Sequence, residues 1–417
     1  MTDILKDKII GLGVTGSIAC YKAIDLASKL TQSGAGIDVI LTRGAREFVT
    51  ALAFSAITHR SVSEDMFDPR SELSIDHVAI AERADLIVVA PATAHTIAKM
   101  ANGLADDALT ATVLATGAPI LVAPAMDAHM FGNPATQENV RTLKRRGVTI
   151  VGPASGRLAS GLVGKGRMVE TAELMGWIRM ILGKGGDLAG RKVVVSAGGT
   201  QEAIDPVRVV TNNSSGKMGY AIAEAARDRG GEAVVVAAPN ALPDPVGVRV
   251  VNVNTALDMQ KAVTDEIEDA DVVIMAAAVS DWRPVTTADQ KIKKGESTEW
   301  NLEFTKNPDI IAGLPSDKLV KVGFAAETED LIANAQTKLV SKGLDLIAAN
   351  DVTATDAGFA TDTNRVMLFD REGGIEVMPL MSKYDVGHRI LDRVKPMFKD
   401  GLKQDIAVGE DAAGGRD

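Results

Sequence analysis

Two stretches of the chain carry glycine and serine in an order that suits anion binding. Residues 11–16 form a G-x-G-x-x-G pattern followed by Ser17, and Ser214-Ser-Gly216 forms a second polar turn in mid-chain. Each turn lies between an apolar, strand-like run and a segment of helical period. Unpaired backbone N–H groups and the helix dipole then point at one ligand. We therefore expect one anion site in each half.

The first glycine pattern does not by itself identify a dinucleotide site. Such a site also needs an acidic residue at the end of the second strand, where it binds the ribose hydroxyls. The corresponding strand ends here in Thr42-Arg43. NAD is therefore disfavoured, whereas a mononucleotide phosphate could still bind residues 13–17. Ser17 and Thr42 can each add a hydroxyl contact.

Two further motifs follow apolar runs in the first half. Pro91-Ala-Thr-Ala94 and Pro124-Ala-Met-Asp127 come directly after residues 85–90 and 119–123. Open α/β sheets bind ligands at the carboxyl ends of their strands. The same Pro-Ala pair at two successive strand ends therefore favours a site over a simple turn. His77 precedes the first of these runs, and the alternative to a functional role is a surface or capping histidine.

Cationic residues gather in the second half. Lys291 and Lys293 share one face of a possible strand, so one of them could point inward. The alternative is that residues 291–294 are simply a run of charged side chains in solvent. Lys338 and Lys342 are four residues apart on a predicted helix, so both could reach one phosphate. Asp281, after the run 271–276, could hold Mg²⁺ or a nucleotide hydroxyl, or cap a helix. These residue types suit nucleotidyl transfer.

Apolar runs alternate with helical patterns along the whole chain. The strands and helices that they predict must position the motifs and the charged residues described above. This alternation predicts an α/β protein with two doubly wound, mainly parallel-sheet, Rossmann-like domains, the first of them flavodoxin-like. Strands are expected at 8–12, 37–42, 85–90, 119–123 and 148–151, and then at 192–196, 232–237, 249–253, 271–276, 320–324 and 345–349. A β-hairpin is expected over residues 366–378. The glycine-rich segment 155–167 breaks the pattern and is predicted to be a mobile loop, either a surface connection or a lid.

The predicted domains cover residues 1–182 and 191–399. A flexible glycine-rich linker, 183–190, joins them, and a polar tail, 400–417, is expected to be disordered. The length of 417 residues allows each domain its own core.

Composition excludes several classes of protein. The net charge of -10 argues against nucleic acid as the main partner. Cys20 is the single cysteine, so no intrachain disulfide can form and a reducing compartment is favoured. The N-terminus lacks the features of a signal peptide, and no apolar run is long enough to span a membrane. We expect a cytoplasmic protein without a membrane partner.

Several motifs in both halves of the chain resemble those of a known family. In the first half GVTGSIACYK (13–22), His77, PATAHTIAKMANGLADD (91–107), PAMD (124–127) and GKGRM (164–168) resemble the flavin-dependent cysteine decarboxylases. In the second half the similar segments are DPVR (205–208), Asn212, SSGKMG (214–219), AAAVSDW (276–282), KIKK (291–294), KNPDI (306–310), GFAAET (323–328) and AND (349–351). Together they resemble the bacterial bifunctional phosphopantothenoylcysteine decarboxylase / phosphopantothenate–cysteine ligases, from about Lys8 to Val394.

The resemblance implies that the first half binds FMN, often at a subunit interface. The flavin would oxidise the thiol end of phosphopantothenoylcysteine to a thioaldehyde, the adjacent carboxylate would leave as CO₂, and the electrons would return. His77 matches the catalytic histidine of the family. The implied FMN contacts are Gly13, Thr15, Gly16, Ser17, Thr42, Pro91, Ala92, Thr93 and Ala94.

Two residues depart from the decarboxylase pattern. Asp127 replaces an asparagine that contacts the substrate carboxylate, and Ser160 replaces a reactive cysteine that donates a proton. An ionised Asp127 would repel a carboxylate unless it is protonated or turned away. We expect decarboxylation to survive in altered or slower form. The alternatives are a ligase whose first half is an FMN-binding scaffold, and a flavin-binding regulatory protein.

For the second half the resemblance implies a ligase. CTP would activate the carboxylate of 4′-phosphopantothenate as an acyl-cytidylate, L-cysteine would attack it, and phosphopantothenoylcysteine would result. Lys291 matches the catalytic lysine, Asn212 handles the acyl-cytidylate, and Asp281 would hold Mg²⁺. The implied contacts to CTP and substrate are Met275, Ala276, Ala277, Asp281, Lys291, Pro308, Asp309, Ile310, Ile311, Phe324, Lys338 and Lys342. A homo-oligomer through both domains is expected.

Overall fold

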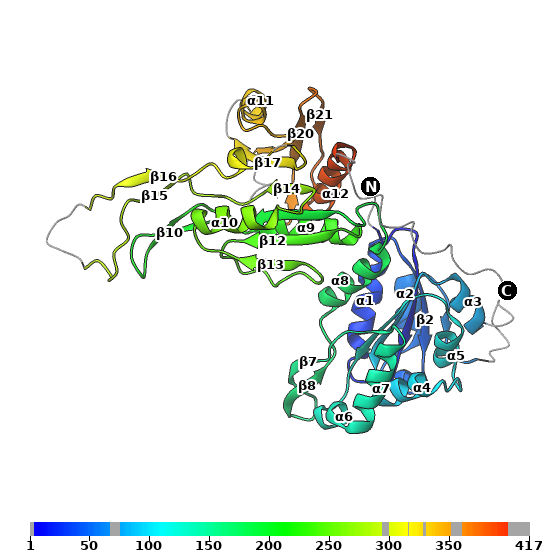
Figure 1. The fold of residues 1–417 in the computed structure, drawn as a ribbon. Coiled ribbons are helices and arrows are strands. Elements are labelled where there is room, and N and C mark those ends of the chain that lie inside the picture. The colour runs from blue at the N-terminus through cyan, green and yellow to red at the C-terminus, as the bar shows by residue number, and fades with distance from the viewer. Residues whose placement is uncertain are drawn as a thin grey trace, which may run out of the picture.

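The computed structural model describes residues 4–66, 76–293, 300–315, 317–327, 331–351 and 361–398. The predicted tail 400–417 and Lys294 lie outside the described residues. The chain forms two α/β units in sequence, each with helices on both faces of a central sheet (Figure 1). The predicted fold class is confirmed.

The N-terminal sheet is parallel throughout and has six strands in the order β3-β2-β1-β4-β5-β6. Without the two-residue edge strand β3, this is the flavodoxin-like order 2-1-3-4-5. The chain order reverses between β1 and β4, which is where such sheets bind ligands. The strands are β1 (Ile9–Val14), β2 (Gly36–Leu41), β3 (Val62–Ser63), β4 (Leu86–Ala92), β5 (Ile120–Pro124) and β6 (Thr149–Ile150).

Alternate side chains of these strands build two cores. Leu12 and Val88 face the helices α1 (Cys20–Gln32), α2 (Ala51–Thr58) and α8 (Thr171–Gly183). Ile87 and Val89 face the opposite layer. That layer contains α3 (Asp76–Arg83), α4 (Ala94–Asn102), α5 (Ala108–Ala115) and α7 (Pro134–Arg145). Two short elements, the 3₁₀ turn η1 (Ala45–Glu47) and helix α6 (Ala128–Gly132), follow the ends of β2 and β5.

The C-terminal sheet has eight strands in the order β13-β12-β9-β14-β17-β18-β20-β21. Six strands are parallel, and the last two form the predicted antiparallel hairpin at one edge. The chain order reverses between β9 and β14. The strands are β9 (Lys192–Ala197), β12 (Glu232–Ala237), β13 (Arg249–Asn252), β14 (Val272–Met275), β17 (Val320–Glu327), β18 (Leu346–Asp351), β20 (Val366–Asp370) and β21 (Ile375–Val377).

Four helices cover this second sheet. Helices α9 (Lys217–Asp228) and α12 (Lys383–Val394) pack on one face. Helices α10 (Ala256–Glu266) and α11 (Leu331–Ser341) pack on the other. The 3₁₀ turns η2 (Ile311–Gly313) and η3 (Lys395–Met397) complete the helical elements, and the short strands β19 (Thr363–Asn364) and β22 (Met381–Ser382) pair beside α12.

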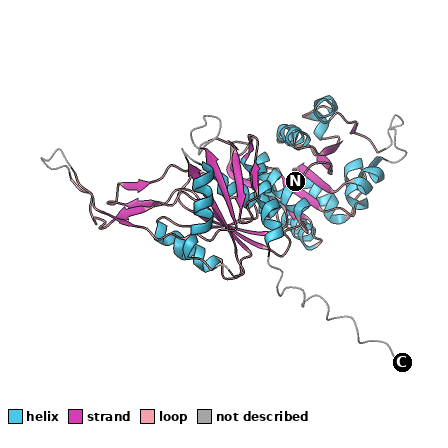
Figure 2. Cartoon of the chain, turned by 90° about the horizontal axis from the view of Figure 1, so that it is seen from above, coloured by secondary structure: helices cyan, strands magenta, loops and turns pink. Residues whose placement is uncertain are grey.

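An arm extends from the C-terminal unit, and the sequence did not predict it. It consists of the antiparallel pairs β10 (Gln201–Ala203) with β11 (Val209–Thr211) and β15 (Trp282–Pro284) with β16 (Phe304–Lys306). Both views show this region standing away from the eight-stranded sheet (Figures 1 and 2). Its strands are three residues long, so their alternation was too short to detect.

The segment 155–167 is a hairpin and not the predicted loop. Its strands β7 (Ala154–Arg157) and β8 (Val163–Arg167) pair antiparallel, and we call this hairpin the flap. Most flap side chains are exposed or half-buried, so no apolar alternation marks the strands in the sequence.

Residues 183–190, which we predicted to be a flexible linker, pack against the C-terminal unit. Leu188 is fully buried and its N–H donates to the Arg229 carbonyl at 3.0 Å. Asp187 forms an ion pair with Arg229 at 2.7 Å. A Cβ added at Gly183 would clash with the backbone of Asp228. The glycines therefore permit close packing against the end of α9. No helix in the described part of the chain is long and apolar enough to cross a membrane.

Candidate functional sites

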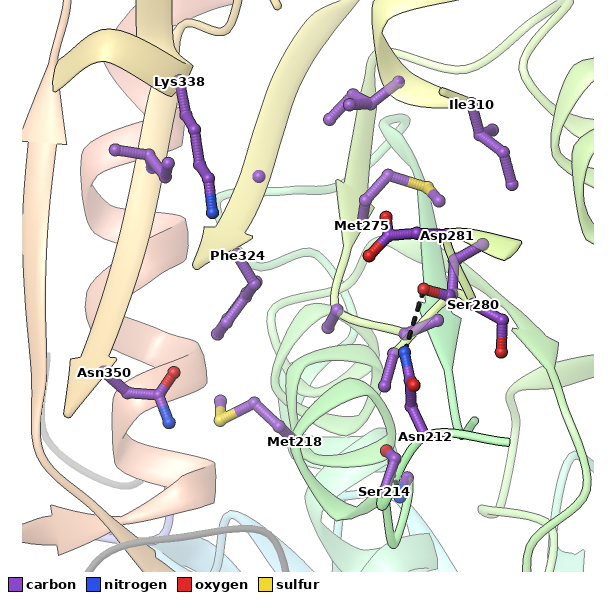
Figure 3. A pocket seen from close by; sticks show the side chains of 18 of the residues that line it. Asn212, Ser214, Met218, Met275, Ser280, Asp281, Ile310, Phe324, Lys338 and Asn350 are labelled. Atoms are coloured by element: carbon purple, nitrogen blue, oxygen red, sulfur yellow. Dashed lines mark hydrogen bonds between the residues drawn. The ribbon is translucent and has the colours of Figure 1, made fainter. Parts of the chain in front are cut away.

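A cavity of about 580 Å³ lies at the carboxyl end of β14, and residues of β17 and β18 are also on its wall. The strand order reverses between β9 and β14, and open α/β sheets leave a crevice at such a reversal. Its wall comes from the turn before α9, the loop after β14, the segment after β16 and helix α11 (Figure 3). The second glycine-serine turn therefore borders this cavity, as the sequence suggested.

The cavity brings together nearly all the residues predicted for the ligase site. Those on its wall are Asn212, Met275, Ala276, Ala277, Asp281, Pro308, Asp309, Ile310, Ile311, Phe324, Lys338 and Lys342. Lys291 is the predicted residue that does not line it.

Asn212 is held against the loop that follows β14. Its Nδ2 donates to the carbonyl of Val279 at 3.1 Å (Figure 3). Asn307 holds the same loop from the other side, because its Nδ2 donates to the Ser280 carbonyl at 2.8 Å and its N–H to the Asp281 carbonyl at 2.8 Å. These contacts fix the loop that carries Asp281 on the wall of the cavity.

Helix α9 begins at the cavity with a left-handed residue. Gly216 is its N-cap with φ +75°, a conformation that side chains disfavour, and no side chain caps this end. The Ser214 hydroxyl accepts from the Gly216 N–H at 3.4 Å. The first N–H groups of the helix and the positive end of its dipole therefore border the cavity.

The two lysines predicted to share a phosphate differ in their surroundings. Lys342 forms an ion pair with Asp309 across the cavity wall at 3.0 Å. Lys338 points its ammonium group toward the region of Phe324 (Figure 3). An anionic ligand in contact with both would have to compete with Asp309 for Lys342.

Asp281 offers a single carboxylate to a metal. The described residues contain no group of three or more His, Cys, Asp or Glu side chains that could hold an ion. Mg²⁺ is commonly held by one or two carboxylates together with substrate phosphates and water. Asp281 on the cavity wall fits that kind of site.

Lys291 belongs to the arm. The loop that carries it is anchored by Asp205, whose carboxylate accepts from the Ile292 N–H at 3.2 Å, and by Arg208, which donates to the Ile292 carbonyl at 3.0 Å. The Arg208 guanidinium pairs with Asp205 and holds the pKa of that carboxyl well below its usual range. The DPVR motif is therefore an anchor for the Lys291 loop.

The second cavity, of about 470 Å³, lies in the N-terminal unit beside the switch between β1 and β4. The predicted residues on its wall are Gly16, Ser17, Thr93, Asp127 and Ser160. The N-terminal turn of α1 and the flap form much of the rest. No side chain accepts from the first turn of α1 after its N-cap Ala19, and the Ser17 hydroxyl, which accepts from the Ala19 N–H at 3.4 Å, lies beside this turn. This donor set fits the phosphate of a flavin mononucleotide.

Other predicted cofactor residues frame this cavity and do not line it. Thr15 is buried; its Oγ1 donates to the Pro91 carbonyl at 2.7 Å and accepts from the Thr93 N–H at 3.0 Å. Thr42 similarly joins the ends of β1 and β2, because its N–H donates to the Val14 carbonyl at 3.1 Å. A Cβ at Gly13 would clash with a leucine of α5, so this glycine serves helix packing. Pro91, Ala92 and Ala94 are also absent from the cavity wall.

The two residues that depart from the decarboxylase pattern contact each other. The Ser160 hydroxyl of the flap donates to Oδ2 of Asp127 at 2.7 Å, and the His129 N–H donates to Oδ1 at 2.9 Å. The hydrogen bond from Ser160, and then that from His129, lower the pKa of the Asp127 carboxyl. Asp127 is therefore ionised near neutral pH and is turned toward the flap.

His77 lies in α3 and lines neither cavity. Its Nδ1 is buried and has no hydrogen-bond partner among the described residues. The structure of one chain therefore does not bring His77 together with Asp127 and Ser160.

Several cavity residues were missed by sequence reasoning. Arg157 and Arg167 of the flap line the N-terminal cavity, and Lys217, Asn364 and Lys383 line the C-terminal one. Lys217 directly follows the Ser-Ser-Gly turn, and this position could have marked it as a cavity residue. Lys383 is an isolated lysine at the start of the last helix, and nothing in its local sequence marks it.

The fold and the two cavities define a two-domain α/β protein with a ligand-sized cavity in each domain, beside the point where the strand order of its sheet reverses. Residues 2–183 match the family model described as flavoprotein, and residues 188–397 match that of the DNA/pantothenate metabolism flavoprotein C-terminal domain. The coenzyme A biosynthesis bifunctional protein CoaBC of Vibrio vulnificus is 44% identical over 94% of this chain and 99% of its own length. The protein of the same name from Bacillus subtilis is 44% identical over 95% of this chain and 98% of its own length. A crystal structure of a CoaBC C-terminal domain is 38% identical and covers 51% of this chain and 97% of its own, with a TM-score of 0.44.

The chain therefore belongs to the family of bifunctional coenzyme A biosynthesis proteins. It is an enzyme with a decarboxylase in its flavoprotein half and a ligase in its C-terminal half. The predicted family and the predicted pair of activities are confirmed.

Proposed function

We propose that the C-terminal cavity joins 4′-phosphopantothenate to L-cysteine at the expense of CTP. The observation behind this proposal is that twelve predicted contact residues from separate segments line one cavity at the sheet's switch point. Asn212 and the turn before α9 would hold the acyl-cytidylate, and the segment 308–311 with Phe324 would border the cytidine. Asp281 would bind Mg²⁺ together with the phosphates of CTP. Lys291 would act from the arm.

For the N-terminal cavity we propose FMN as cofactor and phosphopantothenoylcysteine as substrate. Ser17 and the N-terminus of α1 would bind the flavin phosphate, and Thr15 and Thr42 would hold the loops around it. Bound FMN would supply the reversible oxidation that this decarboxylation requires. Asp127 cannot receive the substrate carboxylate while it is ionised, so Arg157 and Arg167 on the same wall are the groups suited to that anion.

A homo-oligomer through both domains remains our proposal. Ile18 and Tyr21 are 60% and 63% exposed beside the N-terminal cavity. Trp282 and Phe304 are 48% and 39% exposed on the arm. Large apolar side chains beside both sites would be covered by neighbouring subunits. Light scattering on the purified chain tests this proposal. The cytoplasm, where these substrates and a reduced Cys20 would be found, is the proposed compartment.

One reaction mixture tests the proposed function. The purified chain is supplied with 4′-phosphopantothenate, L-cysteine, CTP, Mg²⁺ and FMN, and both pyrophosphate and the mass of the product are measured. We expect CTP-dependent pyrophosphate and a product that has lost CO₂, namely 4′-phosphopantetheine. A product that retains its carboxyl group would indicate a ligase with a flavin-binding scaffold. Flavin binding without pyrophosphate would indicate a regulatory protein.

A further inference from the structure

A carboxylate and an ammonium group face each other on the wall of the C-terminal cavity. Lys342 directly follows α11, and its N–H donates to the Lys338 carbonyl at 3.0 Å, so it continues the last turn of that helix. Asp309 lies in the segment after β16, and its Oδ2 is 3.0 Å from the Lys342 Nζ. Both residues line the cavity. This ion pair therefore lies where a polyphosphate is expected to bind.

Apolar packing holds the backbones of the two partners in place. Ile310 and Ile311, which follow Asp309, are buried in the same apolar cluster as Leu339 of α11. The Asp309 Oδ1 also accepts from the Ala312 N–H at 3.3 Å, at the start of η2. The acidic and basic side chains of the pair nevertheless stay 45% and 35% exposed. The ion pair can therefore break and re-form by side-chain rotation, without movement of the backbone.

The ion pair is weak enough for its partners to exchange. A half-exposed pair of lysine and aspartate contributes little to stability, because water and salt screen it. A polyphosphate carries several negative charges and offers an ammonium group stronger, charge-assisted hydrogen bonds. A polyphosphate in contact with Lys342 would therefore displace Asp309. The displaced carboxylate would remain close to this second anion and would repel it.

We propose that Asp309 is the exchangeable counterion of Lys342. It pairs with the lysine in the absence of nucleotide, is displaced by the phosphates of CTP, and pairs with the lysine again as pyrophosphate leaves. Asp309 thereby weakens the binding of the polyphosphate product and speeds its release, which makes it a positioning residue for Lys342. This role rests on the proposed CTP-dependent ligation.

The test measures the dissociation constants of inorganic pyrophosphate and CTP by calorimetry on the full chain with Mg²⁺ present. Asp309→Asn keeps an acceptor for the Ala312 N–H and removes the charge. Loss of one competing, half-exposed ion pair predicts roughly two- to five-fold tighter binding of pyrophosphate, which should then inhibit ligation at correspondingly lower concentrations. The matched control is Asp265→Asn, because Asp265 pairs with Lys261 at 2.6 Å on α10 of the same domain and does not line this cavity. This control should leave both dissociation constants unchanged.

A double-mutant cycle shows whether Asp309 acts through Lys342. Lys342→Met alone should weaken the binding of pyrophosphate, and adding Asp309→Asn to that variant should bring no gain in affinity. Equal gains from Asp309→Asn with and without Lys342 would overturn the proposal, because they would reflect net charge alone. Unchanged binding in Asp309→Asn would also overturn it, as would weaker binding, which would indicate that the carboxylate holds Mg²⁺ or the nucleotide. A wild-type chain that binds neither CTP nor pyrophosphate would instead refute the proposed ligase function.

Discussion

The substitution Asn212→Asp separates the two steps proposed for the ligase. In the structure the Asn212 amide donates to the Val279 carbonyl at 3.1 Å, on the loop that leads to Asp281. A carboxylate of the same shape cannot donate, and it places a negative charge opposite a carbonyl and beside the expected phosphates. We expect activation by CTP to continue and the transfer to cysteine to stall.

The size of the effect distinguishes a catalytic amide from one that only supports the loop. A lost hydrogen bond to Val279 is worth about 1 kcal/mol, which would slow both steps by roughly five-fold. Loss of a donor at a developing charge slows the step concerned by roughly 10²–10³-fold. We expect the larger value for formation of phosphopantothenoylcysteine and the smaller one for release of pyrophosphate.

A rapid-quench assay measures both quantities in one experiment. In Asn212→Asp, we expect a burst of about one pyrophosphate per site with little ligated product, and mass spectrometry should detect the acyl-cytidylate. Asn102→Asp is the matched control, because Asn102 is an exposed asparagine of the other domain whose Nδ2 donates to the Ala98 carbonyl at 2.8 Å. Equal, roughly five-fold losses in both steps would refute a role for Asn212 in the transfer.

Three further predictions concern the flap and the junction between the domains. Ser160→Cys should speed CO₂ release and Ser160→Ala should not, because a thiol is the better proton donor; equal rates in the two variants would contradict this. Hydrogen bonds from Ser160 and then His129 lower the pKa of Asp127 from 3.8, so the hydrogen bond between the Asp127 carboxylate and the flap should persist above pH 4 and weaken only as the pH falls below 3.8. The rate of proteolytic cleavage in the flap, measured as a function of pH, tests this. A rise in that rate near pH 6 would contradict it. Arg229→Met should lower the free energy of unfolding, measured in urea, by about 3 kcal/mol. This is the lower end of the range for breaking a buried ion pair, because Asp187 and Asp392 stay partly solvated. A loss below about 1 kcal/mol would show that these ion pairs do not stabilise the junction.

The order of the strands in the two large sheets was predictable from the sequence, and so was the meeting of most residues predicted for the ligase site at one cavity. Buried parallel strands read as apolar runs, and their carboxyl ends must meet at one edge of the sheet. The motif at 276–281 follows such a run, β14, so it had to lie at this edge. The motifs at 212–216 and 306–311 follow the short arm strands β11 and β16, and the folding of the arm brings them to the same cavity. The flap, the arm and the packed segment 183–190 were not predictable. Their strands are short or exposed, and their glycines signal close packing as readily as flexibility.

Within the sites, the sequence by itself determined which segments converge, and the tertiary structure decided which side chains face the ligand. The hydroxyls of Thr15, which is buried, and Thr42, which is half-buried, donate to the backbone carbonyls of Pro91 and Val14, and neither residue lines the N-terminal cavity. Asp127 and Ser160 meet because the flap folds back over the end of β5. Lys383 reaches the C-terminal cavity because α12 packs beside α9, a contact between segments far apart in the chain. Periodicity reports local backbone geometry, whereas the direction of a loop side chain depends on the segments packed around it.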